Sequence, residues 1–473
     1  MNKTKSRTKI EYGDFQTPLI LTEKICHKLI SLGISPELII EPTCGIGNFI
    51  KSANKIFNNS QKIIGIDLNK NYIEQLSNDL NSNNKITIIH DNFFEIDLNQ
   101  IILKSNPKIL IIGNFPWVTN SQQGSIKGLN LPEKNNFQAH NGLDAITGNS
   151  NFDISEWMLI KCANFLQNYH GYLAMLCKTS VARKLLNYLS KNNYYLSSCA
   201  TYGIDTKKYF DATVEACLLL CQFEPGIKNY ICDVFTNLDT EKYEQIGYYH
   251  NRLIRDLTTF EKFKYLYTNK PQIKWRSGVK HDCSKIMEFR KIGKMFINGL
   301  GELIELEDTY IFPLLKGSNI ANGEIGKTQK YVLVTQKFIG EDTINIKKIA
   351  PLTWYYLESH ASHLDKRQSK IYQKSPRFSI FGVGDYSFSP WKIAISGLYK
   401  KLEFRLIHPL DTKPVMFDDT VYFLSFKNQE SAKKMLDFLT SSDVIDFYTS
   451  LIFWDEKRPI KSSILNCLNL RNF

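Results

Sequence analysis

The amino-acid sequence predicts an α/β fold with a doubly wound parallel sheet, followed by a mixed α+β domain. At 473 residues the chain is long enough for two or three domains, each with its own core. Between residues 37 and 112, short apolar runs alternate with segments of helical periodicity, a pattern typical of strands buried between helices. Beyond Pro225 this alternation fades and Lys, Tyr and Trp become more frequent. We therefore expect two domains, 1–235 and 236–473.

A glycine-rich turn follows the first predicted strand, 37–41. Glu41 ends this strand, and Pro42-Thr43-Cys44-Gly45-Ile46-Gly47-Asn48 leads into a segment of helical periodicity. A strand, a Gly-x-Gly turn and a helix form the nucleotide-binding arrangement of a doubly wound fold. The turn lacks the third glycine of the dinucleotide fingerprint, and the absence of Gly-Lys-Ser/Thr excludes a P-loop. A Gly-x-Gly alone is a weak signal, so a plain tight turn remains the alternative.

Two further predicted strands end in acidic residues. The strand 62–66 is followed by Asp67, about 20 residues past the glycines, where an acid can accept both hydroxyls of a ribose. The strand 85–90 is followed by Asp91, which can accept a hydrogen bond from an adenine amino group. Either acid alone is more often a solvated strand end or a helix cap. Because they follow successive strands, an adenosine site is the better interpretation.

The fourth predicted strand, 108–112, runs into Gly113-Asn114-Phe115-Pro116-Trp117. In open α/β sheets, ligands bind at the carboxyl edge, where this stretch is expected to lie. The side-chain oxygen of Asn114 and the backbone carbonyl of Phe115 can each accept a hydrogen bond. Together they can hold an exocyclic NH2 group, while Pro116 stiffens the turn and Trp117 stacks on the ring. The stretch predicts an amino-group clamp for a nucleobase.

The ordered chain is expected to open with Gly13-Asp14-Phe15-Gln16-Thr17-Pro18. Thr17 suits a helix N-cap and Pro18 suits the first helical position. The simplest interpretation is a capped helix. The alternative is a turn that closes over a small molecule held by the later motifs.

These stretches, taken together and in order, resemble motifs X, I, II, III and IV of amino-methylating DNA methyltransferases. The resemblance covers residues 11–225, and the order of its motifs is similar to that of the γ class found in restriction–modification systems. It implies a Rossmann-like domain that uses S-adenosyl-L-methionine, followed by a DNA target-recognition domain. The matching stretches are 13–18, 41–48, 67, 91–93 and 114–117.

The resemblance also implies roles for individual residues. The cofactor's methionine, ribose and adenine parts are expected to meet Phe15, Thr17, Glu41, Cys44, Gly45, Gly47, Asp67, Leu68, Asp91 and Phe93. The catalytic residues implied are Asn114, Phe115, Pro116, Trp117 and Phe210, the last packing on the second face of a flipped base. The family's usual stretch is Asn-Pro-Pro-Tyr or Asn-Pro-Pro-Phe, so Phe115 replaces the first proline here and Trp117 supplies the ring. The carbonyl of Phe115 is retained, whereas the backbone stiffness of a proline is lost.

The chemistry expected of this clamp needs neither a metal nor a strong base. An amino nitrogen conjugated to a ring is a poor nucleophile, because its lone pair is delocalised. Two acceptors that draw its hydrogens out of the plane direct the lone pair towards a methyl donor, so proximity and orientation dominate. The base must first leave the duplex stack, which costs about a few kcal/mol.

The second half of the chain interleaves aromatic and basic residues, which suits contact with phosphates and base edges. Most individual rings there are better explained as core. The net charge of +12 is compatible with double-stranded DNA as partner. The candidate DNA-binding cations are Arg276, Lys280, Lys316, Arg367, Lys370 and Arg377.

Methylation of adenine N6 is the leading hypothesis, and N4-cytosine methylation is its nearest rival. RNA and protein-glutamine methyltransferases share an Asn-x-Pro-aromatic clamp, but the N-terminal motif and the long C-terminal region argue against them. A catalytically weak nucleic-acid-binding module remains a further alternative. No apolar run approaches the length of about 18 residues needed for a membrane span, and no signal peptide or disulfide framework is evident. We expect a cytoplasmic monomer without a metal, and a separate endonuclease for any cleavage.

Overall fold

The computed structural model describes residues 16–80, 84–102, 107–117 and 154–470. The chain forms two compact units, Met1–Leu257 and Thr258–Phe473.

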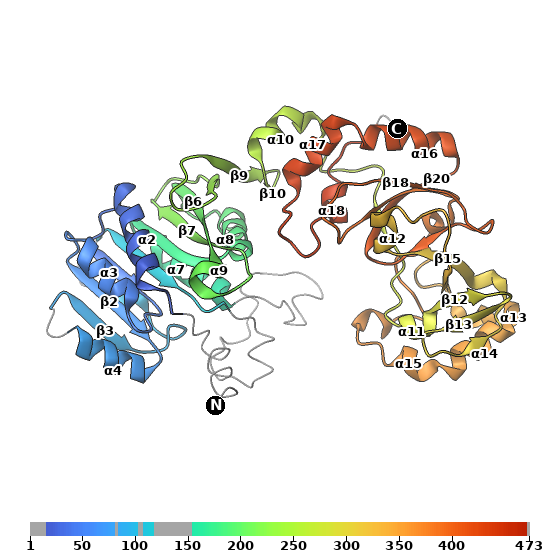
Figure 1. The fold of residues 1–473 in the computed structure, drawn as a ribbon, viewed down its shortest axis with the longest axis horizontal. Coiled ribbons are helices and arrows are strands. Elements are labelled where there is room, and N and C mark those ends of the chain that lie inside the picture. Colours follow the sequence, from blue (N-terminus) through green and yellow to red (C-terminus); the bar gives the residue numbers. More distant parts are fainter. Residues whose placement is uncertain (1–15, 81–83, 103–106, 118–153, 471–473) are drawn as a thin grey trace. The chain divides into compact units, whose positions relative to one another are not determined.

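The first unit is built on one ten-stranded sheet with the order β10-β9-β8-β6-β7-β5-β4-β1-β2-β3 (Figure 1). Strands β1 to β5 are parallel, and β7 lies antiparallel between β5 and β6. The carboxyl ends of β1, β2, β3 and β4 therefore meet at one edge. The strands are β1 Leu38–Glu41, β2 Lys62–Asp67, β3 Ile86–His90, β4 Ile109–Asn114, β5 Gly171–Lys178, β6 Ser198–Ile204, β7 Ala216–Phe223, β8 Cys232–Phe235, β9 Tyr243–Tyr249 and β10 Arg252–Ile254.

Helices cover both faces of this sheet. Leu110 and Ile112 share one core cluster with residues of α2, α3 and α4, which flank the first strands (Figure 1). Ile109 and Ile111 alternate with them, point to the opposite face and are also fully buried; α7 and α8 pack against β5. The helices are α2 Leu19–Ser31, α3 Asn48–Ile56, α4 Lys70–Asp79, α7 Ile154–Leu166, α8 Thr179–Lys191 and α9 Thr206–Phe210, with a 3-10 turn η1 at Leu98–Ile101.

The predicted α/β fold is confirmed, and its elements lie close to the predicted bounds. The four expected strands up to residue 112 are β1 to β4, with β4 extending through Asn114. The sequence did not reveal the outer strands β6, β8, β9 and β10. The expected domain boundary at 235/236 coincides with the end of β8, whereas the compact unit continues to Leu257 because β9 and β10 pair onto the same sheet.

The second unit is a mixed α+β structure with two sheets. One has the order β14-β13-β12-β16-β15-β19 and the other β11-β20-β17-β18. The strands are β11 Arg276–Ser277, β12 Glu288–Ile292, β13 Met295–Asn298, β14 Leu303–Ile304, β15 Ile311–Leu315, β16 Lys330–Leu333, β17 Trp391–Ser396, β18 Arg405–Ile407, β19 Met416–Phe417 and β20 Val421–Phe426. The helices are α10 Leu257–Phe263 (which begins at the last residue of the first unit), α11 Ser284–Met287, α12 Gly317–Asn322, α13 Ile346–Ile349, α14 Pro351–Ser359, α15 Ala361–Asp365, α16 Gln429–Leu439, α17 Ser442–Leu451 and α18 Ser462–Leu465, with 3-10 turns η2 Lys264–Leu266, η3 Asp308–Tyr310, η4 Thr343–Asn345, η5 Lys370–Tyr372 and η6 Asp385–Phe388.

Candidate functional site

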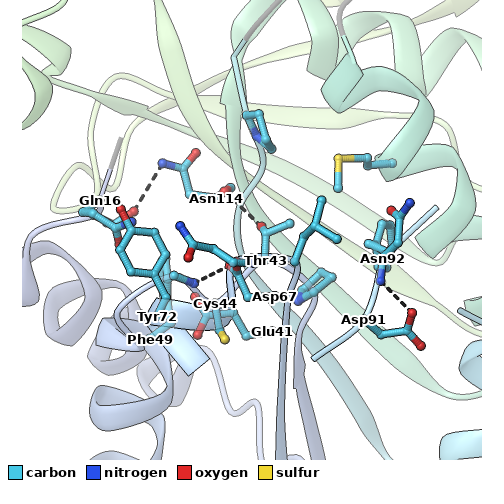
Figure 2. Close-up of a pocket in the computed structure, with 18 of the residues that line it drawn as sticks. Gln16, Glu41, Thr43, Cys44, Phe49, Asp67, Tyr72, Asp91, Asn92 and Asn114 are labelled. Carbon is cyan, nitrogen blue, oxygen red and sulfur yellow. Dashed lines mark hydrogen bonds between the residues drawn. The ribbon is translucent and has the colours of Figure 1, made fainter. Parts of the chain in front are cut away.

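One pocket lies at the carboxyl edge of β1, β2, β3 and β4 (Figure 2). Most residues predicted from the sequence meet in it, because the ends of parallel strands converge there. Gly47 belongs to the adjacent turn without lining the pocket, and Phe15 lies outside the described residues. The predicted residues that line the pocket are Thr17, Glu41, Cys44, Gly45, Asp67, Leu68, Asp91, Phe93, Asn114 and Pro116.

Both glycines of the turn after β1 are required by its geometry. Gly45 has φ +50°, and a Cβ there would lie 2.5 Å from the Oε1 atom of Gln16. Gly47 has φ +77°, and a Cβ there would lie 2.3 Å from a methyl carbon of Leu76. Both positions adopt the left-handed backbone that favours glycine, and a side chain at either one would also have to displace the end of the Gln16 or Leu76 side chain. The Gly-x-Gly pattern therefore reflects a tight turn that wraps the pocket.

The segment before α2 connects this turn to the clamp. The Ile46 amide donates to Gln16 Oε1 (3.2 Å), and Asn48 Nδ2 donates to the Thr17 carbonyl (2.8 Å). Asn114 Nδ2 donates to Thr17 Oγ1 (3.2 Å). The predicted N-cap role of Thr17 is wrong: Pro18 occupies the cap position, and the Thr17 hydroxyl is engaged by Asn114 instead.

Backbone amides orient the three carboxylates of the pocket. Asp67 accepts from the amides of Gly45 (2.7 Å) and Asn69 (2.8 Å), so it ties the glycine turn to the end of β2. Asp91 accepts from the adjacent Asn92 amide (2.7 Å). Glu41 accepts from the Ile50 amide (3.2 Å) in the first turn of α3. Figure 2 shows these acids around the pocket.

The pocket is electrostatically negative in a chain whose net charge is +12. Among the described residues that line it there are three acids and no Lys, Arg or His. Glu41 is only 3% exposed; burial, reinforced by Asp67, raises its pKa well above the usual range despite the Ile50 amide. Burial, followed by repulsion from Glu41 and Asp67, also raises the pKa of the Cys44 thiol. The neutral forms of Glu41 and Cys44 are thereby favoured, so it is Asp67 and Asp91 that favour a ligand carrying positive charge.

Of the predicted clamp, Asn114 and Pro116 line the same pocket, whereas Phe115, Trp117 and Phe210 do not. The carbonyl of Asn114 accepts from Thr43 Oγ1 (3.3 Å), which fixes the backbone at the end of β4. Phe115 is 1% exposed, and its ring centroid lies 5.6 Å from that of Phe93. The ring of Phe115 is therefore held in the core beside Phe93.

The aromatic residues Trp117 and Phe210 lie side by side. Their ring centroids are 5.2 Å apart with an interplanar angle of 60°. Phe210 comes from the short helix α9, and the Trp117 carbonyl accepts a hydrogen bond from Lys178 Nζ (3.1 Å) at the end of β5. A planar ligand that stacks between the two rings must part them.

Several lining residues had not been predicted. Gln16 precedes the predicted Thr17, and this adjacency was the only feature of the sequence that indicated it. Tyr72 lies in the first turn of α4, where nothing in the sequence distinguishes it from a surface residue. The unpredicted lining residues are Gln16, Pro42, Thr43, Asn48, Phe49, Asn69, Tyr72, Asn92, Phe94, Ile154 and Met158.

In the second unit, Arg367, one of the six predicted DNA-binding cations, is bonded to backbone carbonyls. The Arg367 guanidinium donates to the carbonyls of Ser379 (2.7 Å) and His281 (3.3 Å). It also stacks over the ring of Tyr372, at 3.7 Å from the centroid. The Arg367 side chain therefore links the segments around His281, Tyr372 and Ser379.

Of the other five cations, Arg276, Lys370 and Arg377 are exposed, whereas Lys280 and Lys316 are half-buried. Lys316 pairs with Glu288 (2.5 Å), Arg377 with Asp365 (3.0 Å) and Lys280 with Asp282 (3.6 Å). Arg276 is exposed, with its guanidinium 4.9 Å from the ring centroid of Tyr386. Lys370 is exposed at the start of η5.

A concave surface in the second unit gathers further cations around Glu288. Although burial raises the pKa of Glu288, hydrogen bonds from His281 and Lys316 bring it below the usual value. Arg290 and Lys330 are exposed register partners on β12 and β16, and neither pairs with a carboxylate of the described chain. The cations lining this surface are Lys285, Arg290, Lys316 and Lys330. A sequence alone does not reveal such a cross-strand cluster.

Two negative observations concern the described part of the chain. It contains no group of three or more His, Cys, Asp or Glu residues arranged to hold a metal ion. None of its helices combines the length and apolar character needed to cross a membrane.

Comparison with known proteins identifies one relative along nearly the whole chain. The type II methyltransferase M.NspV of Nostoc sp. (strain ATCC 29411 / PCC 7524) is 60% identical over 466 residues, which cover 98% of this chain and 97% of that protein. The type II methyltransferase M.CvrRI of Paramecium bursaria Chlorella virus XZ-6E is 36% identical over 107 residues, 23% of this chain and 25% of that one. No protein-family model matches the chain.

Among solved structures, the type IIL restriction–modification enzyme MmeI in complex with DNA has a similar fold. The TM-score is 0.52 at 14% sequence identity, and the match covers 98% of this chain and 69% of that chain. At this level of identity the similarity concerns the fold.

Proposed function

We propose a specific reaction for this chain, which belongs to the type II methyltransferase family: transfer of a methyl group from S-adenosyl-L-methionine to the N6 amino group of an adenine flipped out of duplex DNA. Family membership supports DNA methylation in a restriction–modification context. The γ-class assignment, the adenine target and the cofactor belong to our proposal.

The pocket suits this cofactor in the chemistry of its groups. A cationic ligand is favoured by the carboxylates of Asp67 and Asp91, with no opposing base among the described lining residues. Asp67 is oriented to accept ribose hydroxyls, Asp91 and Phe93 suit an adenine ring, and Glu41 with the glycine turn suits the methionine end. When bound, the cofactor supplies an electrophilic methyl group on a sulfonium.

The observation that carries the proposal is the position of Asn114. Asn114 and Pro116 line the same pocket as Glu41, Asp67 and Asp91. An amino group held by the clamp therefore faces the site where the cofactor's charge is favoured. This arrangement satisfies the need for proximity and orientation in methyl transfer to a weak nucleophile.

Residues of this chain orient the amino group. The Asn114 side chain donates one N–H to Thr17 Oγ1, and this hydrogen bond fixes the orientation of the side-chain amide and of its Oδ1 atom. The buried Phe115 supplies the second acceptor through its carbonyl. Hydrogen bonds to both acceptors move the amino group towards tetrahedral geometry, and Trp117 and Phe210 part to stack on the extruded base.

The burial of Phe115 also bears on the alternative of a catalytically weak module. That alternative arose from the missing proline, and the packing of Phe115 against Phe93 favours a rigid and active clamp. N4-cytosine presents a similar amino group, so it remains the outcome that competes with adenine in a direct assay.

We propose that the second unit contacts DNA through cations at its surface. Arg290 and Lys330 face each other across β12 and β16. Like charges directly opposite each other destabilise a sheet, so an anion bound between them relieves a local cost. These two residues join Arg276, Lys280, Lys316, Lys370 and Arg377 as candidates, whereas Arg367 acts by shaping the loops. We also propose that the protein acts as a monomer and that any DNA cleavage is carried out by a separate endonuclease.

The reaction is tested with Asn114→Ala and labelled S-adenosyl-L-methionine on duplex DNA. Loss of this acceptor is expected to lower kcat by about 100-fold or more, while binding of S-adenosyl-L-homocysteine is retained. Asn229→Ala, an exposed residue of the same unit outside the pocket, is the matched control and should transfer methyl groups normally. If Asn114→Ala lost cofactor binding instead, Asn114 would belong to the cofactor site and the clamp assignment would be wrong.

A further inference from the structure

The loop after β3 forms the wall of the pocket expected to receive adenine. It carries Asp91 and Phe93 and lies between β3 and the turn η1. Apart from the Asp91 amide donating to the Asp67 carbonyl (3.2 Å) and short contacts within the loop, such as the amides of Glu95 and Ile96 donating to the Asn92 carbonyl, the loop has no regular ladder of hydrogen bonds. Its shape must therefore be stabilised by groups from other parts of the chain.

One ammonium group gathers the carbonyls of this loop. Lys161 Nζ donates to the carbonyls of Phe93 (2.7 Å), Phe94 (3.1 Å) and Ile96 (2.7 Å). Lys161 lies in α7, and the three acceptors are 65 to 68 residues away along the chain. All three N–H groups of a lysine can thus be used on one short segment.

The surroundings of Lys161 indicate that the loop is its principal partner. The side chain is half-buried, and in the described part of the chain no carboxylate lies within ion-pairing distance of it. Its ammonium also lies 5.1 Å from the ring centroid of Phe93 and 5.8 Å from that of Trp157. Burial lowers the pKa of Lys161, as expected where carbonyls and rings replace water around a cation.

The loop in turn connects the pocket to the clamp. Phe93 is 4% exposed, lines the pocket and packs against the ring of Phe115. Lys161 itself does not line the pocket, so it can act on a ligand only through the loop. We propose that Lys161 is a positioning residue that sets the adenine-binding shape of the Asp91–Ile96 loop, an inference that rests on the proposed use of S-adenosyl-L-methionine.

A matched control separates this role from a general contribution to folding. Lys85 also places its ammonium on a backbone carbonyl, that of Phe57 (3.1 Å), and burial likewise lowers its pKa. It belongs to the same unit and does not line the pocket. Lys85→Met therefore removes a similar interaction away from the loop.

The test is calorimetric binding of S-adenosyl-L-homocysteine to the full chain as wild type, Lys161→Met, Lys161→Gln and Lys85→Met. Lys161→Met is expected to weaken binding at least about tenfold, because hydrogen bonds from a charged donor are lost. The Gln side chain of Lys161→Gln is shorter than that of lysine but keeps two N–H donors, so this variant should show an intermediate affinity. Lys85→Met should bind as the wild type does. In methylation assays, Lys161→Met should raise KM for the cofactor and leave kcat and KM for DNA nearly unchanged.

The outcomes discriminate between this inference and the proposed function. Wild-type affinity in Lys161→Met would overturn the positioning role, as would equal losses in Lys161→Met and Lys85→Met. If Lys161→Met does not fold, Lys161→Gln decides, and wild-type affinity in that variant overturns the inference. Failure of the wild type itself to bind would overturn both the cofactor assignment and the inference, whereas binding without methylation of DNA would overturn the proposed function only.

Discussion

Replacement of Lys392 by Met should change how the stability of the protein depends on pH. Lys392 lies in β17 and is 1% exposed, with its ammonium 5.8 and 5.7 Å from the ring centroids of Phe417 and Phe423. Its Nζ donates to the carbonyls of Ser387 (2.8 Å) and Val415 (2.6 Å). Burial lowers the pKa of Lys392 from its usual 10.5 to about 7.

The sign of the effect follows from proton binding. Between the folded pKa and the unfolded pKa, the unfolded chain carries one more proton at this site, so stability rises with pH. The gain approaches about 1.4 kcal/mol per pH unit, and from pH 6 to pH 9 it amounts to about 2.7 kcal/mol. This value is an upper bound, because the two hydrogen bonds and the rings favour the charged ammonium.

The assay is chemical unfolding of the wild type and of Lys392→Met at both pH values. Subtracting the variant cancels the titration of every other group, so the difference in unfolding free energy isolates Lys392. Lys433→Met, at an exposed lysine of α16, is the control and should parallel the wild type. Parallel pH profiles for the wild type and Lys392→Met would refute a neutralised buried lysine.

Three further predictions concern the pocket. Burial raises the pKa of Glu41 above its usual 4.5, so the folded protein retains a proton that the unfolded chain releases, and stability falls as pH rises from that value. Glu41→Gln should remove this fall, measured by thermal unfolding between pH 5 and 8. The same variant should also weaken binding of S-adenosyl-L-homocysteine. Phe115→Ala should cost about 3–5 kcal/mol of stability through the cavity it leaves, and it should lower kcat. Phe115→Pro should retain more activity than Phe115→Ala. Equal activity in the two variants would show that rigidity at this position does not matter. Thr17→Val removes the oxygen that accepts from Asn114 Nδ2 and should lower kcat about tenfold, whereas an unchanged kcat would show that Thr17 does not orient the amide.

The main features of the fold and pocket were predictable because their signals are local. Apolar runs define β1 to β4, and parallel strands place Glu41, Asp67, Asp91 and Asn114 at one edge without further information. The glycines were predictable for a similar reason, since the left-handed backbone of that turn favours glycine.

The features that escaped prediction depend on contacts between distant residues. Lys161 reaches a loop 65 to 68 residues away, and no spacing in the sequence marks it. Phe115 departs from the expected proline, and its packing on Phe93 is a tertiary contact that the sequence does not show. Arg367 is a basic residue in a stretch whose composition suits DNA binding, so the sequence alone predicted a DNA contact. Its stacking on Tyr372 and its hydrogen bonds to carbonyls are tertiary contacts that the sequence does not show. The outer strands β8 to β10 likewise owe their place to pairing with the existing sheet.

The identity of the methylated nucleoside tests the central claim most directly. Purified protein is incubated with methyl-labelled S-adenosyl-L-methionine and mixed-sequence duplex DNA, which is then digested to nucleosides and separated. We predict that the label is found in N6-methyladenine and is absent when Asn114→Ala replaces the wild type. Label in cytosine, or label in RNA or protein but not in DNA, would contradict the account.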